Sequence, residues 1–168
     1  MSELRIGLGV DAHAFADGVP LVLGGVEFDS PRGLAGHSDG DVIAHALIDA
    51  LLGAAGLGDI GSLFPPGEPE WEAAASLEML RRAAAQIRDA GWEPVNADCV
   101  LIGEEPRIAP LREQMRGRLA EAVGVGAERI KVRATTTDKL GFTGRGEGLA
   151  AQAVALVRQA GQTVSDPD

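Results

Sequence analysis

The chain has 168 residues, 45% of them hydrophobic and 24% charged, and its formal net charge at pH 7 is −10. This length and composition predict a globular chain with a proper core and exclude a disordered one. The acidic balance argues against nonspecific binding to nucleic acid or anionic lipid, because both require clustered Lys and Arg. With 4% aromatic residues and no tyrosine, the chain also offers no stacking platform for bases. We therefore expect no nucleic-acid partner and no membrane partner.

Two further features bear on the cellular compartment. The chain begins Met-Ser-Glu-Leu-Arg without the apolar segment of a signal peptide, and no uninterrupted apolar run reaches the length of a membrane span. Cys99 is the single cysteine, which excludes an intrachain disulfide and a zinc site built from thiolates. We expect a cytoplasmic protein in which any zinc ion is bound by histidine and carboxylate ligands.

The N-terminal part of the chain predicts a strand followed by a hairpin. Residues 4–10 alternate larger apolar residues with Gly or Arg, a pattern typical of a strand. Residues 21–23 and 26–28 are short apolar runs on either side of Gly24-Gly25. A Gly-Gly pair supplies the positive φ angles that a two-residue hairpin turn needs, so these runs are predicted to pair with each other.

Residues 41–54 carry an apolar stripe at helical spacing and predict a helix, with Ser38 and Asp39 as its expected N-caps. This predicted helix is apolar nearly all round, so we expect more than one of its sides to be covered, one of them by a partner subunit. Residues 57–69 contain several Gly and Pro residues and predict a loop that could act as a lid.

The rest of the chain alternates helices with strands. Helical spacing and strand-like runs predict helices over 73–90, 109–123 and 149–159, and strands over 95–102 and 130–137. This order indicates an α+β fold of two layers, in which helices pack on one face of a mixed β-sheet and a small β-hairpin is added. We predict a single domain over residues 1–160 and a frayed tail over 161–168.

A candidate metal site is visible near the N-terminus. Asp11 and His13 are two residues apart at the end of the first predicted strand, so their side chains point to the same face. His45 lies on the predicted helix, roughly opposite the apolar stripe. One carboxylate and two imidazoles suit zinc, and three protein ligands leave a fourth tetrahedral position open, as in catalytic zinc sites. The alternatives are that His45 is a hydrogen-bonded structural residue and that Asp11 closes the strand in a turn.

A second polar segment follows the strand predicted at 130–137. Thr135, Thr136 and Thr137 offer hydroxyl groups for phosphate oxygens, and Asp138 could bind Mg²⁺ together with a substrate phosphate. The alternative is that the threonines are ordinary strand residues. Residues 141–148 are rich in glycine and lead into the last predicted helix, where backbone amides could bind an anion. This segment lacks the endings of a P-loop and of a dinucleotide fingerprint, and a plain turn is the alternative.

At this point the chain is seen to resemble a known family, the 2-C-methyl-D-erythritol 2,4-cyclodiphosphate synthases of the non-mevalonate isoprenoid pathway. The resemblance runs from Arg5 to about Arg158. It rests on long, ordered segments, which are Asp11-Ala12-His13, Gly36-His37-Ser38-Asp39-Gly40-Asp41, His45-Ala46-Leu47, Asp59-Ile60-Gly61, and the run from Thr135 through Asp138-Lys139-Leu140-Gly141-Phe142 to Gly148. Chance is not a serious explanation for motifs this long.

The resemblance implies a lyase that converts 4-diphosphocytidyl-2-C-methyl-D-erythritol 2-phosphate into the cyclic diphosphate and CMP. It implies a homotrimer with active sites at the subunit interfaces, one Zn²⁺ per subunit, and Mg²⁺ or Mn²⁺ with the substrate diphosphate. By family position, the zinc ligands are Asp11, His13 and His45, the catalytic residues are His37 and Thr136, and Asp138 is the carboxylate for a second metal. The positions implied to contact substrate are Asp11, His13, His37, Ser38, Asp59, Gly61, Phe64, Gly103, Pro106, Arg107, Ala109, Ala134, Thr135, Thr136, Thr137, Asp138, Phe142 and Arg145.

Three positions depart from the family pattern. Pro66-Gly67-Glu68 stands where an acidic residue and a hydroxyl are common, Arg107 where Lys is frequent, and Asp138 where Glu is common. The shorter Asp138 side chain is expected to shift the second metal or to admit a water, and Arg107 keeps the charge with a different donor geometry.

Two other functions use the same residues. A zinc phosphohydrolase would activate water and release inorganic phosphate. A metal-stabilised oligomeric binding protein would use zinc mainly for folding.

Overall fold

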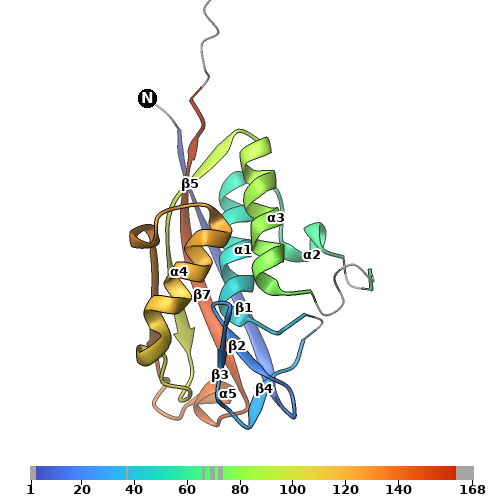
Figure 1. Ribbon diagram of the computed structural model, residues 1–168, viewed down its shortest axis with the longest axis vertical. Coiled ribbons are helices and arrows are strands. Elements are labelled where there is room, and N and C mark those ends of the chain that lie inside the picture. The colour runs from blue at the N-terminus through green and yellow to red at the C-terminus, as the bar shows by residue number, and fades with distance from the viewer. Residues whose placement is uncertain (1–2, 37, 66, 69–70, 72–73, 162–168) are drawn as a thin grey trace, which may run out of the picture.

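The computed structural model describes residues 3–36, 38–65, 67–68, 71 and 74–161 (Figure 1). His37, Pro66 and residues 162–168 of the tail predicted to fray lie outside the described residues. The described chain has a mixed α+β architecture, as predicted from the sequence. Two sheets and a layer of helices share one hydrophobic core.

The main sheet has five strands in the order β4-β1-β7-β5-β6. All neighbouring strands are antiparallel except β5 and β6, which are parallel. The sheet is therefore mixed, as expected. Its strands are β1 (Leu4–Asp17), β4 (Arg32–Leu34), β5 (Trp92–Ile102), β6 (Ile130–Thr135) and β7 (Gly148–Gln159).

The predicted hairpin is present as β2 (Leu21–Leu23) paired with β3 (Val26–Phe28). Gly24 and Gly25 form its turn with φ values of 56° and 73°, which confirms the need for glycine at both positions. Their N–H groups donate to the carboxylate of Asp41 at 2.9 and 2.7 Å. The turn is thereby joined to the start of the long helix that follows.

Three long helices lie together on one side of the sheet (Figure 1). They are α1 (Val42–Ala55), α3 (Ser76–Asp89) and α4 (Arg112–Val123). Shorter pieces are α2 (Ile60–Leu63), α5 (Gly141–Gly144), η1 (Ala109–Leu111) and η2 (Ala127–Arg129). Each long helix lies close to where the sequence predicts one, and η1 is the first turn of the helix predicted at 109–123.

The helix α1 is the centre of the core, since it packs against β1 and β7 on one side and against α3 on the other. Twelve of its fourteen residues are buried. The cover expected from a partner subunit is therefore supplied by this chain's own sheet and by α3. The N-cap of α1 is Asp41, whose side chain accepts from the N–H groups of Ile43 and Ala44. Ser38 and Asp39, predicted to be the caps, have other partners.

The prediction of a last helix over 149–159 is wrong, because these residues form β7 between β1 and β5. Alanine and leucine favour helices, and six of the eleven residues predicted to be helical are Ala or Leu. The buried positions Leu149, Ala151, Ala153 and Ala155 alternate, however, which is the period of a strand. The small side chains of the three alanines let α1 lie close to the sheet. The glycine-rich segment before β7 consequently leads into a strand and provides no helix N-terminus.

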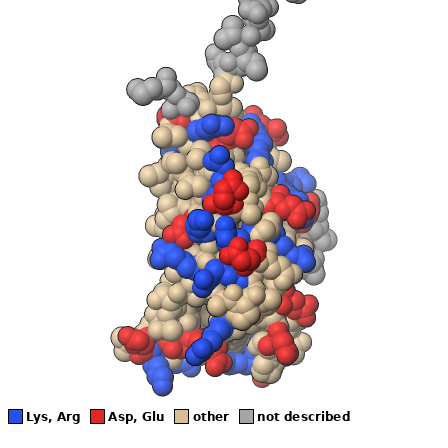
Figure 2. Space-filling model, turned by 60° about the vertical axis from the view of Figure 1, so that its left-hand side comes forward, with Lys and Arg blue, Asp and Glu red and all other residues tan. Residues whose placement is uncertain are grey.

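On the face seen in Figure 2, Lys and Arg side chains are interspersed with Asp and Glu. Among the described residues, no helix has the length and apolar character needed to cross a membrane.

Candidate metal centre

Three potential ligand atoms converge between β1 and α1. Asp11 Oδ2 lies 2.8 Å from His13 Nε2 and 3.0 Å from His45 Nδ1, and the two imidazole nitrogens are 3.2 Å apart. Asp11 and His13 are half-buried, and His45 is buried in the first turn of α1. The sequence prediction that these three side chains meet is therefore confirmed.

Local structure explains this convergence. Asp11 and His13 alternate with Ala12 on β1, which continues through both residues and does not end at Asp11 as a turn would require. Gly7 and Gly9 precede them on the same strand, and without side chains there α1 can approach β1 closely. His45 is thus placed directly above the two strand residues.

The charges in this cluster stabilise one another. Burial opposes ionisation of Asp11, but hydrogen bonds and charge interactions with His13 and His45 outweigh it and hold the pKa of Asp11 well below its usual range. The hydrogen bond to Asp11 raises the pKa of His13 above its ordinary value, against the opposing effect of burial. The cluster therefore holds an ionised carboxylate, that of Asp11, beside two imidazole rings.

The geometry suits a tetrahedral metal. A zinc ion about 2.0–2.1 Å from its ligands keeps them roughly 3.3 Å apart. The separations of 2.8, 3.0 and 3.2 Å in the cluster are slightly shorter, so a small outward movement of the side chains would admit the ion. Within the described part of the chain, this is the group of His, Cys, Asp and Glu side chains found to be arranged for a metal ion.

His45 has a second set of contacts on its other ring nitrogen. His45 Nε2 lies 2.9 Å from Ser76 Oγ and 3.0 Å from Ser38 Oγ. Ser76 is the first residue of α3 and also hydrogen-bonds to Asp39. Ser76 is not among the predicted site residues, because the helix was predicted to start at residue 73 and Ser76 then fell inside it. A serine just before an apolar helical run could have been recognised as a helix start.

A pocket of about 220 Å³ opens to solvent beside the cluster. In one chain it is smaller than the roughly 300–1,000 Å³ that is usual for small-molecule sites. Asp11, His13, Ser38 and His45 form its polar wall. The opposite walls are mostly apolar and come from the segment after α1 and from α3, with lining residues Ile60, Gly61, Phe64, Pro65, Gly67, Glu68, Trp71 and Met79.

Besides Asp11, His13 and Ser38, the predicted substrate contacts Gly61 and Phe64 line this pocket. The Phe64 ring packs edge-on against Trp71 with 4.7 Å between ring centres. Asp59 caps α2 by accepting from the N–H and the hydroxyl of Ser62 at 2.8 and 2.7 Å, and these bonds lower the pKa of Asp59. Asp59 is thus an exposed, ionised carboxylate at the base of the same segment.

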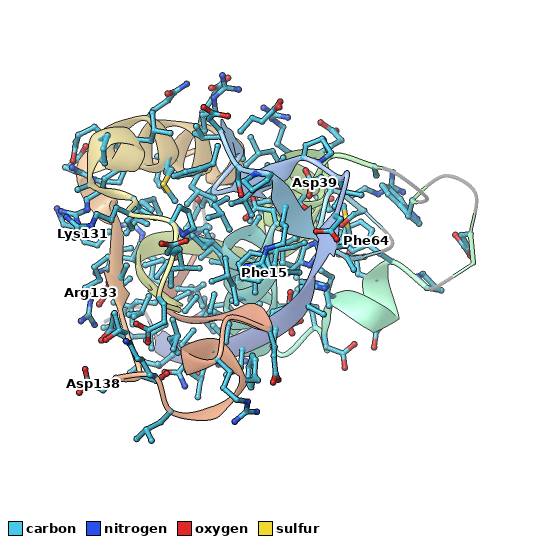
Figure 3. The ribbon with its side chains drawn as sticks, turned by 90° about the horizontal axis from the view of Figure 1, so that it is seen from below. Phe15, Asp39, Phe64, Lys131, Arg133 and Asp138 are labelled. Carbon is cyan, nitrogen blue, oxygen red and sulfur yellow. The ribbon has the colours of Figure 1, made fainter. Side chains whose placement is uncertain are left out.

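The other predicted contacts within the described residues are not among those that line this pocket. Figure 3 shows Asp138, Arg133 and Lys131 on one side of the molecule and Phe64 and Asp39 on the other. The residues that lie apart from the metal cluster pocket are Gly103, Pro106, Arg107, Ala109, Ala134, Thr135, Thr136, Thr137, Asp138, Phe142 and Arg145. The structure of one chain therefore divides the predicted site into a metal half and a second half built around the ends of β5 and β6.

The second half has an unusual backbone. Asp138 and Lys139 have φ values of 51° and 64°, in the left-handed region that residues other than glycine rarely adopt. Such conformations concentrate at functional sites. Thr137 Oγ1 donates to the Leu140 carbonyl at 2.7 Å and lies 3.0 Å from Thr143 Oγ1, which holds the turn together. Arg145 pairs with Glu147 at 2.7 Å.

A three-ligand cluster on the wall of a small-molecule pocket, within a two-layer α+β fold, is typical of metal-dependent enzymes. The comparisons with known proteins agree with that class. The chain belongs to the YgbB family, whose model matches residues 4–158.

Relatives within the family carry a specific name. The chain is 58% identical over 163 residues to the 2-C-methyl-D-erythritol 2,4-cyclodiphosphate synthase of Rubrobacter xylanophilus, covering 95% of this chain and 98% of that protein. Among solved structures, the bifunctional IspDF from Campylobacter jejuni matches with a TM-score of 0.91 and 41% identity, over 95% of this chain and 43% of that one. The IspF of Plasmodium falciparum in a CDP complex matches with a TM-score of 0.82 and 30% identity, over 96% and 99%.

Proposed function

We propose that the chain catalyses the reaction named by its relatives, the formation of 2-C-methyl-D-erythritol 2,4-cyclodiphosphate, from 4-diphosphocytidyl-2-C-methyl-D-erythritol 2-phosphate. CMP is the second product, and the product enters the non-mevalonate route to isoprenoid precursors. The observation that carries the proposal is the Asp11, His13 and His45 triangle at the wall of the pocket, in a chain 58% identical to such a synthase over nearly its whole length.

The reaction is an intramolecular phosphoryl transfer. An oxygen of the substrate's 2-phosphate forms a bond to the β-phosphorus of the diphosphate. The bond from that phosphorus to the bridging oxygen breaks, and CMP leaves with this oxygen. Because both partners belong to one molecule, the protein acts mainly by folding the substrate, excluding water and compensating charge.

The residues present fit Zn²⁺ as the resident metal, held by Asp11, His13 and His45. The bound ion would supply positive charge against phosphoryl oxygens, as a template and Lewis acid. The apolar wall with Phe64 and Trp71 keeps water away from the reacting phosphates. Asp59 and Gly61 are proposed to contact the methylerythritol part.

The second half of the site is proposed to bind the cytidine diphosphate. Gly103, Pro106, Arg107, Ala109 and the run from Ala134 to Asp138 are assigned to it, with Phe142 and Arg145 as further contacts. Thr136 and His37 are proposed to stabilise the transition state. Asp138 is proposed to bind Mg²⁺ or Mn²⁺ together with the diphosphate, which suits a single exposed carboxylate because Mg²⁺ is usually held by one or two carboxylates plus phosphates.

The division of the site into two halves supports an oligomer in which the metal half of one copy faces the second half, here called the nucleotide half, of another copy. The sheet face opposite the helices carries an apolar stripe that one chain leaves uncovered. Its members are Leu4, Ile6, Leu8 and Val10 of β1 and Val154 of β7, which are between 46% and 72% exposed. A contiguous apolar patch of this kind marks an interface, and the family resemblance suggests three copies. We also propose a cytoplasmic location for the enzyme.

The oligomer has a direct test. We expect the native chain to sediment as a trimer and Ile6→Glu to sediment as a smaller species with an unchanged helical circular dichroism spectrum, because the charge would be buried in the interface. Glu78→Ala, at an exposed position on α3, is the control and should remain trimeric. A native chain that sediments as a monomer at assay concentrations would contradict the proposal.

Co-expression of two inactive variants tests whether the halves come from different copies. His45→Ala lacks a metal ligand and Thr136→Ala lacks a nucleotide-half residue. In randomly mixed oligomers, roughly a quarter of the sites would combine two intact halves, so activity should reappear. Mixtures as inactive as the parent variants would show that both halves act within one chain.

Phosphorus NMR of a reaction with the native substrate distinguishes this function from the alternatives. The proposed function predicts the cyclic diphosphate together with CMP. A phosphohydrolase would release inorganic phosphate, and a metal-stabilised binding protein would give no turnover.

A further inference from the structure

Behind the metal cluster lies a chain of hydrogen bonds that the proposed reaction does not use. It runs from His45 Nε2 to Ser76 Oγ, at 2.9 Å, and from Ser76 Oγ to Asp39 Oδ1. The Ser76 N–H also donates to Asp39 Oδ2, at 3.0 Å. Ser76 has no exposed surface, so water cannot replace these partners.

The chemistry of the three groups fixes the direction of the chain. An ionised carboxylate only accepts hydrogen bonds, so the single hydroxyl proton of Ser76 is donated to Asp39. Ser76 Oγ can then only accept from His45, and His45 Nε2 must carry the proton in that bond. In a neutral imidazole the other nitrogen has the lone pair. That nitrogen is His45 Nδ1, the atom that faces Asp11 and His13.

The opposite tautomer of His45, with the proton on Nδ1, is favoured by a different neighbour. Asp11 Oδ2, 3.0 Å from His45 Nδ1, would favour a proton on Nδ1, which would leave that nitrogen unable to bind a metal. The same carboxylate oxygen is offered a closer donor, His13 Nε2 at 2.8 Å. The Ser76 hydroxyl favours the proton on the opposite nitrogen of His45. The two sides of the ring therefore compete for one proton.

We propose that Ser76, oriented by Asp39, is a positioning residue that holds His45 in the tautomer and orientation that bind the metal. The proposal rests on the metal site of the proposed function, and it assigns to Asp39 and Ser76 a role beyond helix capping. Outer hydrogen bonds of this type commonly fix the tautomer of metal-binding histidines. Ser38 Oγ, 3.0 Å from the same nitrogen, can share the proton but has no carboxylate of its own at this position.

The hydrogen bonds of Ser76 also join two helices, α1 and α3, at the metal site. Ala75, the N-cap of α3, makes no side-chain capping bond, and Asp39 supplies the acceptor for the Ser76 N–H from 37 residues away. The beginning of α3 is thus fastened to the segment that precedes α1. Movement of α3 would be transmitted to the His45 ring through one hydroxyl group.

Two variants separate orientation from folding. Ser76→Ala removes the acceptor. Asp39→Asn keeps the shape and can still accept from the Ser76 N–H, but its amide can donate to Ser76 Oγ, which frees the serine proton for His45 Nε2 and favours the wrong tautomer. Ser30→Ala, in the loop between β3 and β4 and not part of the pocket beside the metal cluster, is the matched control.

Zinc affinity is measured by competition with a chromophoric chelator. We expect both site variants to bind Zn²⁺ about 10–100-fold more weakly than the native chain and Ser30→Ala to bind with native affinity. Circular dichroism and thermal unfolding of the metal-free proteins show whether each variant is folded. Native zinc affinity in folded Asp39→Asn would overturn the proposal.

Long-range ¹H–¹⁵N NMR of the metal-free protein reads the tautomer directly. The native chain is expected to show His45 protonated on Nε2, with a shift toward Nδ1 in Asp39→Asn. A native His45 protonated mainly on Nδ1 would overturn the proposal even if the variants lost affinity. Neither measurement depends on turnover, so failure to form the cyclic diphosphate would count against the proposed reaction and leave the positioning role standing.

Discussion

Gly9 of β1 lies so close to Ala46 of α1 that a Cβ atom at position 9 would stand 1.9 Å from the Ala46 carbonyl oxygen. Gly7 has the same relation to Ala50, also at 1.9 Å. The backbone of the strand therefore touches the backbone of the helix. Because Asp11 and His13 lie on that strand and His45 on that helix, this contact sets the distance across the metal cluster.

Replacing Gly9 by alanine should therefore damage both stability and metal binding. A methyl group at this position must push β1 and α1 apart, and overpacking of this kind costs about 1–3 kcal/mol of unfolding free energy, or more where backbone cannot yield. We expect Gly9→Ala to lower the urea midpoint and to weaken zinc binding. Gly53→Ala on the same helix is the control, since a Cβ there meets nothing within 4 Å. It should gain about 0.5–1 kcal/mol, and equal effects of the two changes would contradict this interpretation.

Removal of His45 should abolish zinc binding and turnover together, because the ion would lose one of three protein ligands. Metal content by elemental analysis and product formation by phosphorus NMR are the two measurements. His45→Ala that retains zinc at full stoichiometry would refute the ligand assignment.

The stability of the metal-free protein should depend on pH through His13. The hydrogen bond to Asp11 raises the folded-state pKa of His13 above 6.5, so the protonated ring stabilises the fold. That contribution is fully present below about pH 6.5, the ordinary value, and is lost as the pH rises through the folded-state pKa. Urea unfolding in the presence of a chelator should show this loss, and His13→Gln should not.

Asp11 acts in the opposite pH range. Its folded-state pKa is lowered below 3.8, so its contribution to the stability of the fold is present above that value and is lost as the pH falls.

Zinc binding requires a deprotonated His13, so zinc affinity should rise over the same pH range in which the metal-free protein loses the stability that protonated His13 contributes. A zinc affinity independent of pH between about 6 and 8 would contradict the assignment of His13 as a ligand.

Cys99 should report global unfolding. Its side chain is fully buried on β5, and burial raises the pKa of the thiol to about 12. Because the thiolate is the reactive form, a disulfide reagent at neutral pH should label the native protein very slowly. Labelling should become fast at the denaturant concentration where circular dichroism is lost. Fast labelling of the native protein would indicate that β5 opens locally.

The sequence was sufficient to predict the metal cluster because each ligand lies on an element with a regular period. Asp11 and His13 follow strand spacing, and His45 lies on a helix predicted within one residue of its observed ends. The hairpin was equally predictable, since Gly24 and Gly25 both require positive φ.

Other features depend on tertiary structure that no local pattern encodes. The run from Leu149 contains enough alanine to favour a helix, and only its pairing with β1 and β5 makes it a strand. Asp41 rather than Ser38 or Asp39 caps α1, because the glycine turn of the hairpin adds two donors to its carboxylate. Contacts between residues far apart in the chain, such as Asp39 with Ser76, leave no periodic signal.

The odd-numbered residues of β1 from Gly7 to His13 share one face of the strand. The large apolar residues Leu4, Ile6, Leu8 and Val10 occupy the even positions on the other face. Sliding the strand by one residue would drive isoleucine and leucine into the helix backbone and turn both ligands outward. The same alternation that makes room for α1 therefore also aims Asp11 and His13, so that correct strand alignment and a correctly assembled metal centre are a single structural outcome.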